Sequence, residues 1–265
     1  MTVQRTPQQA FLGVTALLFV VSAATTIAWC TSMSAMGEMP MPGGWTMSMV
    51  WLRTPGQTWP GAAASFLGMW IVMMVAMMLP SIVPVLWRYR QAVASAGKTQ
   101  PGWLTALVGL AYFFVWAVFG GAVFPLGAAL SAIAMRQPAL ARAVPISVGA
   151  VVLIAGAFRL TTWNARRVAF CWEPRGSGRA RSSDAGSAWR YGVWLGVHCG
   201  YSCAGLMAVL LVVGVMDLRV MAVVTAAITA ERLAPSGVRV AQSIAVVIVG
   251  AGLLLTAHAI GARLG

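Results

Sequence analysis

Residues 61–87 read GAAASFLGMWIVMMVAMMLPSIVPVLW, and this run contains no charged side chain. It exceeds the roughly 20 apolar residues that an α-helix needs to cross the hydrocarbon core of a bilayer. Its apolar residues follow one another without the strict alternation of a membrane β-strand, which excludes a β-barrel. The run therefore predicts a transmembrane helix.

Similar apolar runs along the whole chain predict an all-α, polytopic transmembrane helical bundle. Of the 265 residues, 60% are apolar and only 9% are charged, whereas a soluble domain has roughly 25% charged residues. We expect a single integral membrane domain over residues 1–265. The expected spans are 10–29, 61–87, 103–132, 144–163, 191–214, 216–231 and 239–259. The bundle thus has about seven spans, or six if the short segment 216–231 is re-entrant.

Basic residues gather in two of the segments between these spans, 88–101 and 164–190. An excess of lysine and arginine marks cytoplasmic loops, so we predict a cytoplasmic amino terminus in a multi-pass protein of the bacterial inner membrane, with 164–190 as a basic cytoplasmic loop. The net charge of +13 then makes the anionic lipids of the inner leaflet the expected partners. No nucleic-acid-binding motif accompanies the charge, so nucleic acid is not expected.

Methionine is concentrated in one part of the chain, with eleven of the sixteen residues between Met33 and Met78. Six of them lie in 30–60, a Gly- and Pro-containing segment that we predict to be a methionine-rich outer loop. Thioethers are soft ligands that suit Cu(I), so this loop is a candidate for capturing the ion. Alternatively, it folds back over the bundle and methionine only fills gaps in the packing.

The second predicted span carries a stripe of methionines. Met69, Met73 and Met77 recur every four residues, with Met74 and Met78 beside them. This spacing stacks thioethers along one face of a helix. The alternative interpretation is ordinary packing of helices.

The fifth predicted span contains the run GVHCGYSCAGLM at 196–207. Cys199, Cys203 and Met207 share one helical face because they are four residues apart, and His198 is adjacent. A disulfide within one helix would be strained, so metal binding is the better interpretation. At 1.5 Å per residue, Cys199 lies about 15 Å from Trp189. Met77 is equally far from Trp87, so the sulfurs of the two spans would meet near the middle of the membrane if these spans contact each other.

The remaining candidates are more isolated. Cys171 follows the fourth span and could exchange metal on the cytoplasmic side, or it could be an ordinary thiol. Cys30 is at the outer mouth, and Arg159 either reaches for the interface or pairs with Glu231. No phosphate-binding glycine loop, paired carboxylates or Ser/His/Asp set is visible, so we do not expect an enzyme.

Three stretches, at 69–86, 155–174 and 198–232, resemble domain of unknown function 2182, a bacterial family described as predicted metal-binding integral membrane proteins. The most specific parts are the MMVAMMLP block at 73–80 and the block at 199–207. The resemblance implies metal-binding roles for Met73, Met74, Met77, Met78, Cys171, Cys199 and Cys203. The chain departs from the family by having Arg167 and Ser202 where members have further cysteines, and by lacking a lysine near Asn164. Fewer thiols imply that His198 or methionine completes the site.

Together these patterns predict a membrane protein that binds a soft transition metal, Cu(I), for transport or delivery across the membrane. Zinc is the second choice, if His198 joins the thiols. A metallochaperone or a membrane subunit is the expected protein partner. The alternative function is a non-transporting assembly or accessory subunit whose methionines and cysteines only pack helices. The predicted metal ligands are Met73, Met74, Met77, Met78, Cys171, His198, Cys199, Cys203 and Met207.

Overall fold

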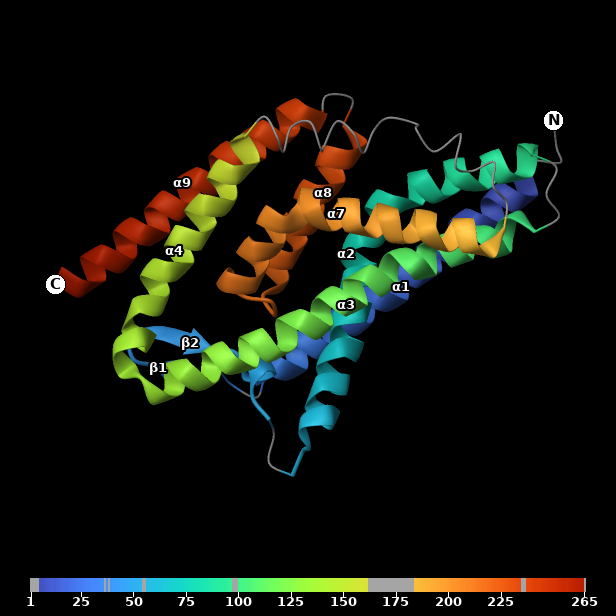
Figure 1. The fold of residues 1–265 in the computed structure, drawn as a ribbon. Helices are drawn as coiled ribbons and strands as arrows, with labels where there is room; N and C mark the ends of the chain where they lie inside the picture. The colour runs from blue at the N-terminus through green and yellow to red at the C-terminus, as the bar shows by residue number, and fades with distance from the viewer. Residues whose placement is uncertain are drawn as a thin grey trace.

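The computed structural model of the protein describes residues 5–35, 37, 39–53, 56–96, 100–161, 184–234 and 237–264. Within this part of the chain, seven α-helices carry nearly all of the residues (Figure 1). They are α1 (Arg5–Ala35), α2 (Trp59–Ser95), α3 (Pro101–Arg136), α4 (Pro138–Leu160), α7 (Ala185–Val213), α8 (Leu218–Leu233) and α9 (Gly237–Leu264). All except α8 contain a stretch long and apolar enough to cross a membrane. The predicted all-α polytopic bundle is thereby confirmed, while most of 164–190, including Cys171, lies outside the described residues.

Neighbouring helices at the start of the chain are antiparallel. Phe11 near the start of α1 packs on Trp87 in the second half of α2, with ring centroids 5.3 Å apart. Phe66 near the start of α2 packs on Phe124 in the second half of α3, at 5.1 Å. The end of α1, the start of α2 and the end of α3 therefore lie at the same end of the bundle.

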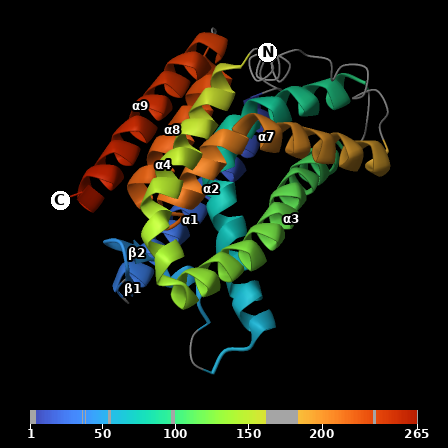
Figure 2. The same ribbon diagram turned by 60° about the vertical axis from the view of Figure 1, so that its left-hand side comes forward.

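The short helix α8 corresponds to the predicted segment 216–231. It has 16 residues, or about 24 Å of helix, which is why it is not among the six helices that could cross a membrane by length. Its two ends nevertheless contact opposite ends of the bundle. Met216, just before α8, contacts Cys30 near the end of α1, and Glu231 near the end of α8 pairs with Arg159 near the end of α4. The helix thus connects the two ends of the bundle, and α9 then runs back antiparallel to α4 (Figures 1 and 2).

The segment predicted as an outer loop contains a small β-hairpin. Strands β1 (Met39–Met41) and β2 (Trp45–Met47) pair antiparallel, and Gly43 and Gly44 form the turn with φ of +105° and +75°, a conformation that glycine adopts without strain. The 3-10 helix η1 (Met49–Trp51) follows. The indole of Trp45 donates a hydrogen bond to the carbonyl of Ala141 in α4, and the side chains of Met41 and Met47 are buried. For these two methionines, the interpretation as packing over the helices is therefore the correct one.

Helix α2 changes direction partway along its length, as Figure 1 shows. Pro80 and Pro84 lie within it, and a proline inside a helix removes a backbone hydrogen bond and bends the axis. The methionine stripe ends directly before Pro80. The bend therefore orients the helical turns that carry Met73 to Met78 relative to the second half of α2.

Close contact between α3 and α7 depends on glycine. A Cβ atom added at Gly192 would lie 2.4 Å from the carbonyl oxygen of Val108, and one at Gly196 would lie 2.9 Å from the side chain of Val115. Neither contact is tolerated by real side chains, so the two glycines permit the short distance between the helices. This approach brings the next turn of α7, which carries Cys199, against α3.

A buried ion pair connects α4 to α8. Arg159 and Glu231 form a salt bridge, with side chains only 1% and 6% exposed, and the guanidinium also donates a hydrogen bond of 3.2 Å to the carbonyl of Ser202 in α7. Of the two interpretations of Arg159 in the sequence, pairing with Glu231 is confirmed. Since the pair joins three helices, it fixes the arrangement of α4, α7 and α8 around the residues that follow.

Candidate metal centre

Two thiols of α7 form the centre of the candidate site. Cys199 and Cys203 are 1% and 3% exposed, and their Sγ atoms are 3.9 Å apart. Both are reduced thiols, as expected from the strain of a disulfide within one helix. The spacing of four residues thus places both sulfurs on one buried face of α7, as the sequence predicts.

Their separation fits two sulfurs that share one metal ion. Metal–sulfur bonds of about 2.3 Å hold two sulfur ligands about 3.8–4.6 Å apart, for angles at the metal between about 110° and 180°. The observed 3.9 Å lies within this interval. The thiols therefore need no rearrangement of the helix to bind one ion together.

Tyr112 of α3 supplies a hydroxyl group to the thiols. Its oxygen and the Sγ of Cys199 share a buried hydrogen bond of 2.9 Å. The contact orients the thiol within an otherwise apolar surrounding. Sequence reasoning missed Tyr112, because a single tyrosine in an apolar helix carries no spacing that points to α7.

Arg232 of α8 supplies a positive charge to the same place. Its Nη2 atom lies 3.8 Å from the Sγ of Cys203 and 3.4 Å from the hydroxyl of Ser202. When a metal ion displaces the thiol proton, this guanidinium would offset part of the negative charge of the thiolate. Arg232 was not among the predicted site residues, because it lies on α8 and no spacing connects it to the thiols of α7.

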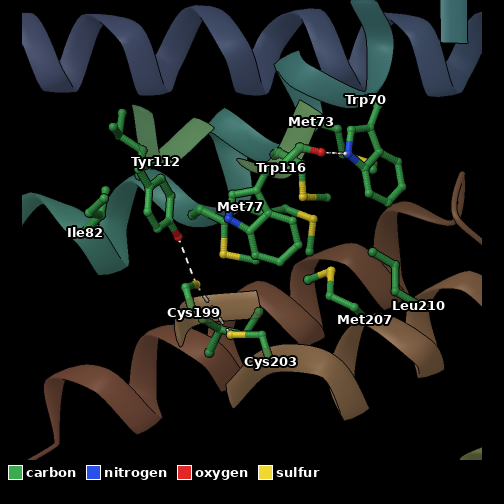
Figure 3. Packing of buried hydrophobic residues seen from close by; sticks show 14 of the residues in the cluster. Trp70, Met73, Met77, Ile82, Tyr112, Trp116, Cys199, Cys203, Met207 and Leu210 are labelled. Carbon is green, nitrogen blue, oxygen red and sulfur yellow. Dashed lines mark hydrogen bonds between the residues drawn. The ribbon is translucent and has the colours of Figure 1, made fainter. Parts of the chain in front are cut away.

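Thioethers from two helices lie in the same buried cluster as the thiols. Met73 and Met77 of α2 and Met207 of α7 are each at most 2% exposed. Figure 3 shows these three side chains among the sticks drawn between the ribbons of the cluster. The backbone of α7 packs mainly against α3 and α4, so long side chains bridge the space between α2 and α7. Cys199, Cys203, Met73, Met77 and Met207 thus belong to one buried cluster, which also contains the predicted ligands Met74 and Met78.

The other predicted ligands are placed differently. Met74 and Met78 are fully buried in the same cluster. The Nδ1 atom of His198 shares a hydrogen bond of 2.8 Å with the carbonyl of Trp194, and its ring packs on that indole. Cys171 lies outside the described residues. Among the residues that the structure describes, no three His, Cys, Asp or Glu side chains form a group that could hold a metal ion.

Comparison with known proteins gives this cluster a context. A sequence model of the PpoB2 family, described as copper chaperone, matches residues 67–255. The chain belongs to the PpoB2 copper chaperone family. No curated protein and no solved structure matches the chain.

The PpoB2 match spans the two thiols of α7, the methionines of α2 and α7, Tyr112 and Arg232. It covers largely the same part of the chain as the resemblance argued from the sequence, and it supports the metal-related family that this resemblance implied. Membership in PpoB2 gives the chain a copper-related role.

Proposed function

We propose that this PpoB2 protein binds Cu(I) inside its helical bundle and transports or delivers it across the membrane. The observation that carries the proposal is the buried pair of thiols, with Sγ atoms 3.9 Å apart, in one buried cluster with methionine thioethers that include Met73, Met77 and Met207. Thiolate and thioether sulfur select soft ions such as Cu(I) over hard cations. Copper here is the cargo, and the bundle is its carrier.

The charges at the site also suit a monovalent ion. Two thiolates and one Cu(I) carry a net charge of −1, and the guanidinium of Arg232, 3.8 Å from Cys203, brings the sum to zero. Burying a net charge away from water is costly. With Zn(II) in place of Cu(I), the same groups would leave a net charge of +1, so the charge balance favours Cu(I).

Removing the charge of Arg232 is expected to weaken copper binding. For Arg232→Gln we expect the Cu(I) affinity to fall by about 10–100-fold, the usual cost of losing an outer partner of a metal ligand. Arg232→Lys retains the charge and should lose much less. Arg219→Gln, which removes an exposed arginine from the same helix, is the matched control. The measurement is competition with a chromogenic Cu(I) chelator, and equal affinities for Arg232→Gln and Arg219→Gln would contradict the role of the charge.

The proposal itself is tested on the full chain, purified in detergent. The chain carries Cys171→Ser, so that the thiol of this residue does not contribute to metal binding. Under reducing, anaerobic conditions we expect the protein to retain Cu(I) after washing with a weaker chelator, and not to retain Zn(II). X-ray absorption at the copper edge should show only sulfur in the first shell. Protein that remains metal-free and purifies with another membrane protein would instead support the accessory-subunit function.

A further inference from the structure

A second pair of sulfurs lies at the other end of the same cluster. The thiol of Cys30, near the end of α1, donates a hydrogen bond of 3.9 Å to the Sδ atom of Met216, in the turn between α7 and α8. Cys30 is only 3% exposed, although it lies close to the end of its helix. Two sulfur-containing side chains that are 186 residues apart in the sequence thus meet at the end of the bundle that carries the β-hairpin.

This pair has the geometry of the thiol pair in α7. The separation of 3.9 Å lies within the interval of about 3.8–4.6 Å expected for two sulfurs on one ion. A third sulfur is close along the chain, because Met33 follows Cys30 by three residues and therefore lies on the same side of α1. Met33 is half-buried. A thiol and a thioether from separate segments, with a second thioether one helical turn away, form a soft ligand set.

The two sulfur pairs belong to one continuous buried cluster. Cys30, Cys199 and Cys203 are all members of it, and Met216 packs against it. Met207, one of the buried thioethers beside the thiols, precedes Met216 by nine residues and lies between the two pairs along the chain. Met207 thus places one further thioether in the stretch of α7 between Cys203 and Met216.

We infer that Cys30 and Met216 form a second Cu(I) site, through which the ion enters or leaves the thiol site in α7. This inference rests on the proposed function. On binding, the thiol of Cys30 releases its proton, and the ion later exchanges this thiolate and the Met216 thioether for sulfur deeper in the bundle. No change of oxidation state is involved. The half-buried Met33 and the exposed Met39 lie at the same end, where they would present thioethers to an arriving ion.

The test counts the Cu(I) ions that four variants bind, each made in the full chain with Cys171→Ser. They are this parent, Cys30→Ser, Cys199→Ser/Cys203→Ser, and the variant with all three changes. Titration with Cu(I) against a chromogenic chelator should give two ions for the parent, one for each of the next two, and none for the last. The chelator also reports affinity, and size-exclusion chromatography in detergent verifies that each variant is folded and monodisperse.

The outcomes separate the two proposals. If Cys30→Ser binds as many ions as the parent, with equal affinity, the second site does not exist and the thiol site stands. If Cys199→Ser/Cys203→Ser binds as many as the parent, the proposed function at α7 is wrong. A further check does not depend on a cysteine. Met216→Leu should lower the Cu(I) affinity of the Cys30–Met216 site by at least about tenfold. Met135→Leu, at an exposed methionine of α3, should leave this affinity unchanged. Equal binding by these two variants would overturn the outer site.

Discussion

Changing both Cys199 and Cys203 to serine is expected to lower the Cu(I) affinity of the proposed thiol site by about 100-fold or more. Losing an outer partner of a metal ligand already costs about 10–100-fold, and this variant removes two ligands. Serine oxygen is a harder donor that binds Cu(I) poorly. Both cysteines are buried, but serine is similar in size to cysteine. The packing of α7 should therefore change little.

The matched control for this variant lies between the two cysteines. Tyr201 is on the same helix but is 53% exposed, so Tyr201→Phe should leave copper binding unchanged. Chelator competition measures the affinity, and the sulfur signal in X-ray absorption should shrink in the double variant alone. A double variant that retains the affinity of the parent would show that the thiols only pack helices.

Replacing Glu231 by alanine is expected to destabilise the protein by about 3–5 kcal/mol, the usual cost of removing one partner of a buried ion pair. The change leaves the cation of Arg159 without its carboxylate in a place where its side chain is 1% exposed. Since Arg159 also donates to the carbonyl of Ser202, the position of the neighbouring Cys203 should be disturbed as well. Thermal unfolding in detergent, followed by circular dichroism, measures the loss.

A second variant shows whether the unpaired charge is the cause. Arg159→Met/Glu231→Leu removes both charges and should regain much of the stability, because apolar side chains of similar size often replace a buried pair at little cost. Arg219→Ala on the same helix, where the side chain is exposed, is the control and should unfold near the parent temperature. If Glu231→Ala unfolds at the same temperature as Arg219→Ala, the ion pair does not stabilise the bundle.

The sequence predicts the helices well but not their full lengths. Apolar runs mark 61–87 and 103–132, whereas α2 extends from Trp59 to Ser95 and α3 from Pro101 to Arg136. The criterion of hydropathy detects only the part of a helix that lies in lipid, and a helix continues beyond it wherever the backbone hydrogen bonds continue. The β-hairpin was missed for a different reason: its strands have three residues each, and only the Gly43–Gly44 pair signals a turn.

The candidate site, too, was only partly predictable from the sequence. Spacing within one helix placed Cys199, Cys203 and Met207 on one face, and spacing within another did so for Met73 and Met77. Tyr112 and Arg232 come from helices that have no such pattern, and only tertiary packing brings them to the thiols. Local periodicity thus finds ligands that share a helix, whereas it cannot find a partner that depends on which helices are neighbours.

The prolines of α2 make the backbone beside the methionine stripe easier to bend. Pro80 and Pro84 have no amide hydrogen, so the carbonyl groups of Ala76 and Pro80 lack their usual partners four residues ahead. The carbonyl of Ala76 directly precedes Met77, and the carbonyl of Pro80 follows Met77 by three residues. Without these two hydrogen bonds, the backbone there is easier to deform than in an unbroken helix. On the proposed function, a small rotation of this backbone would move the thioether of Met77, and a bound ion could then change ligands without any helix unfolding.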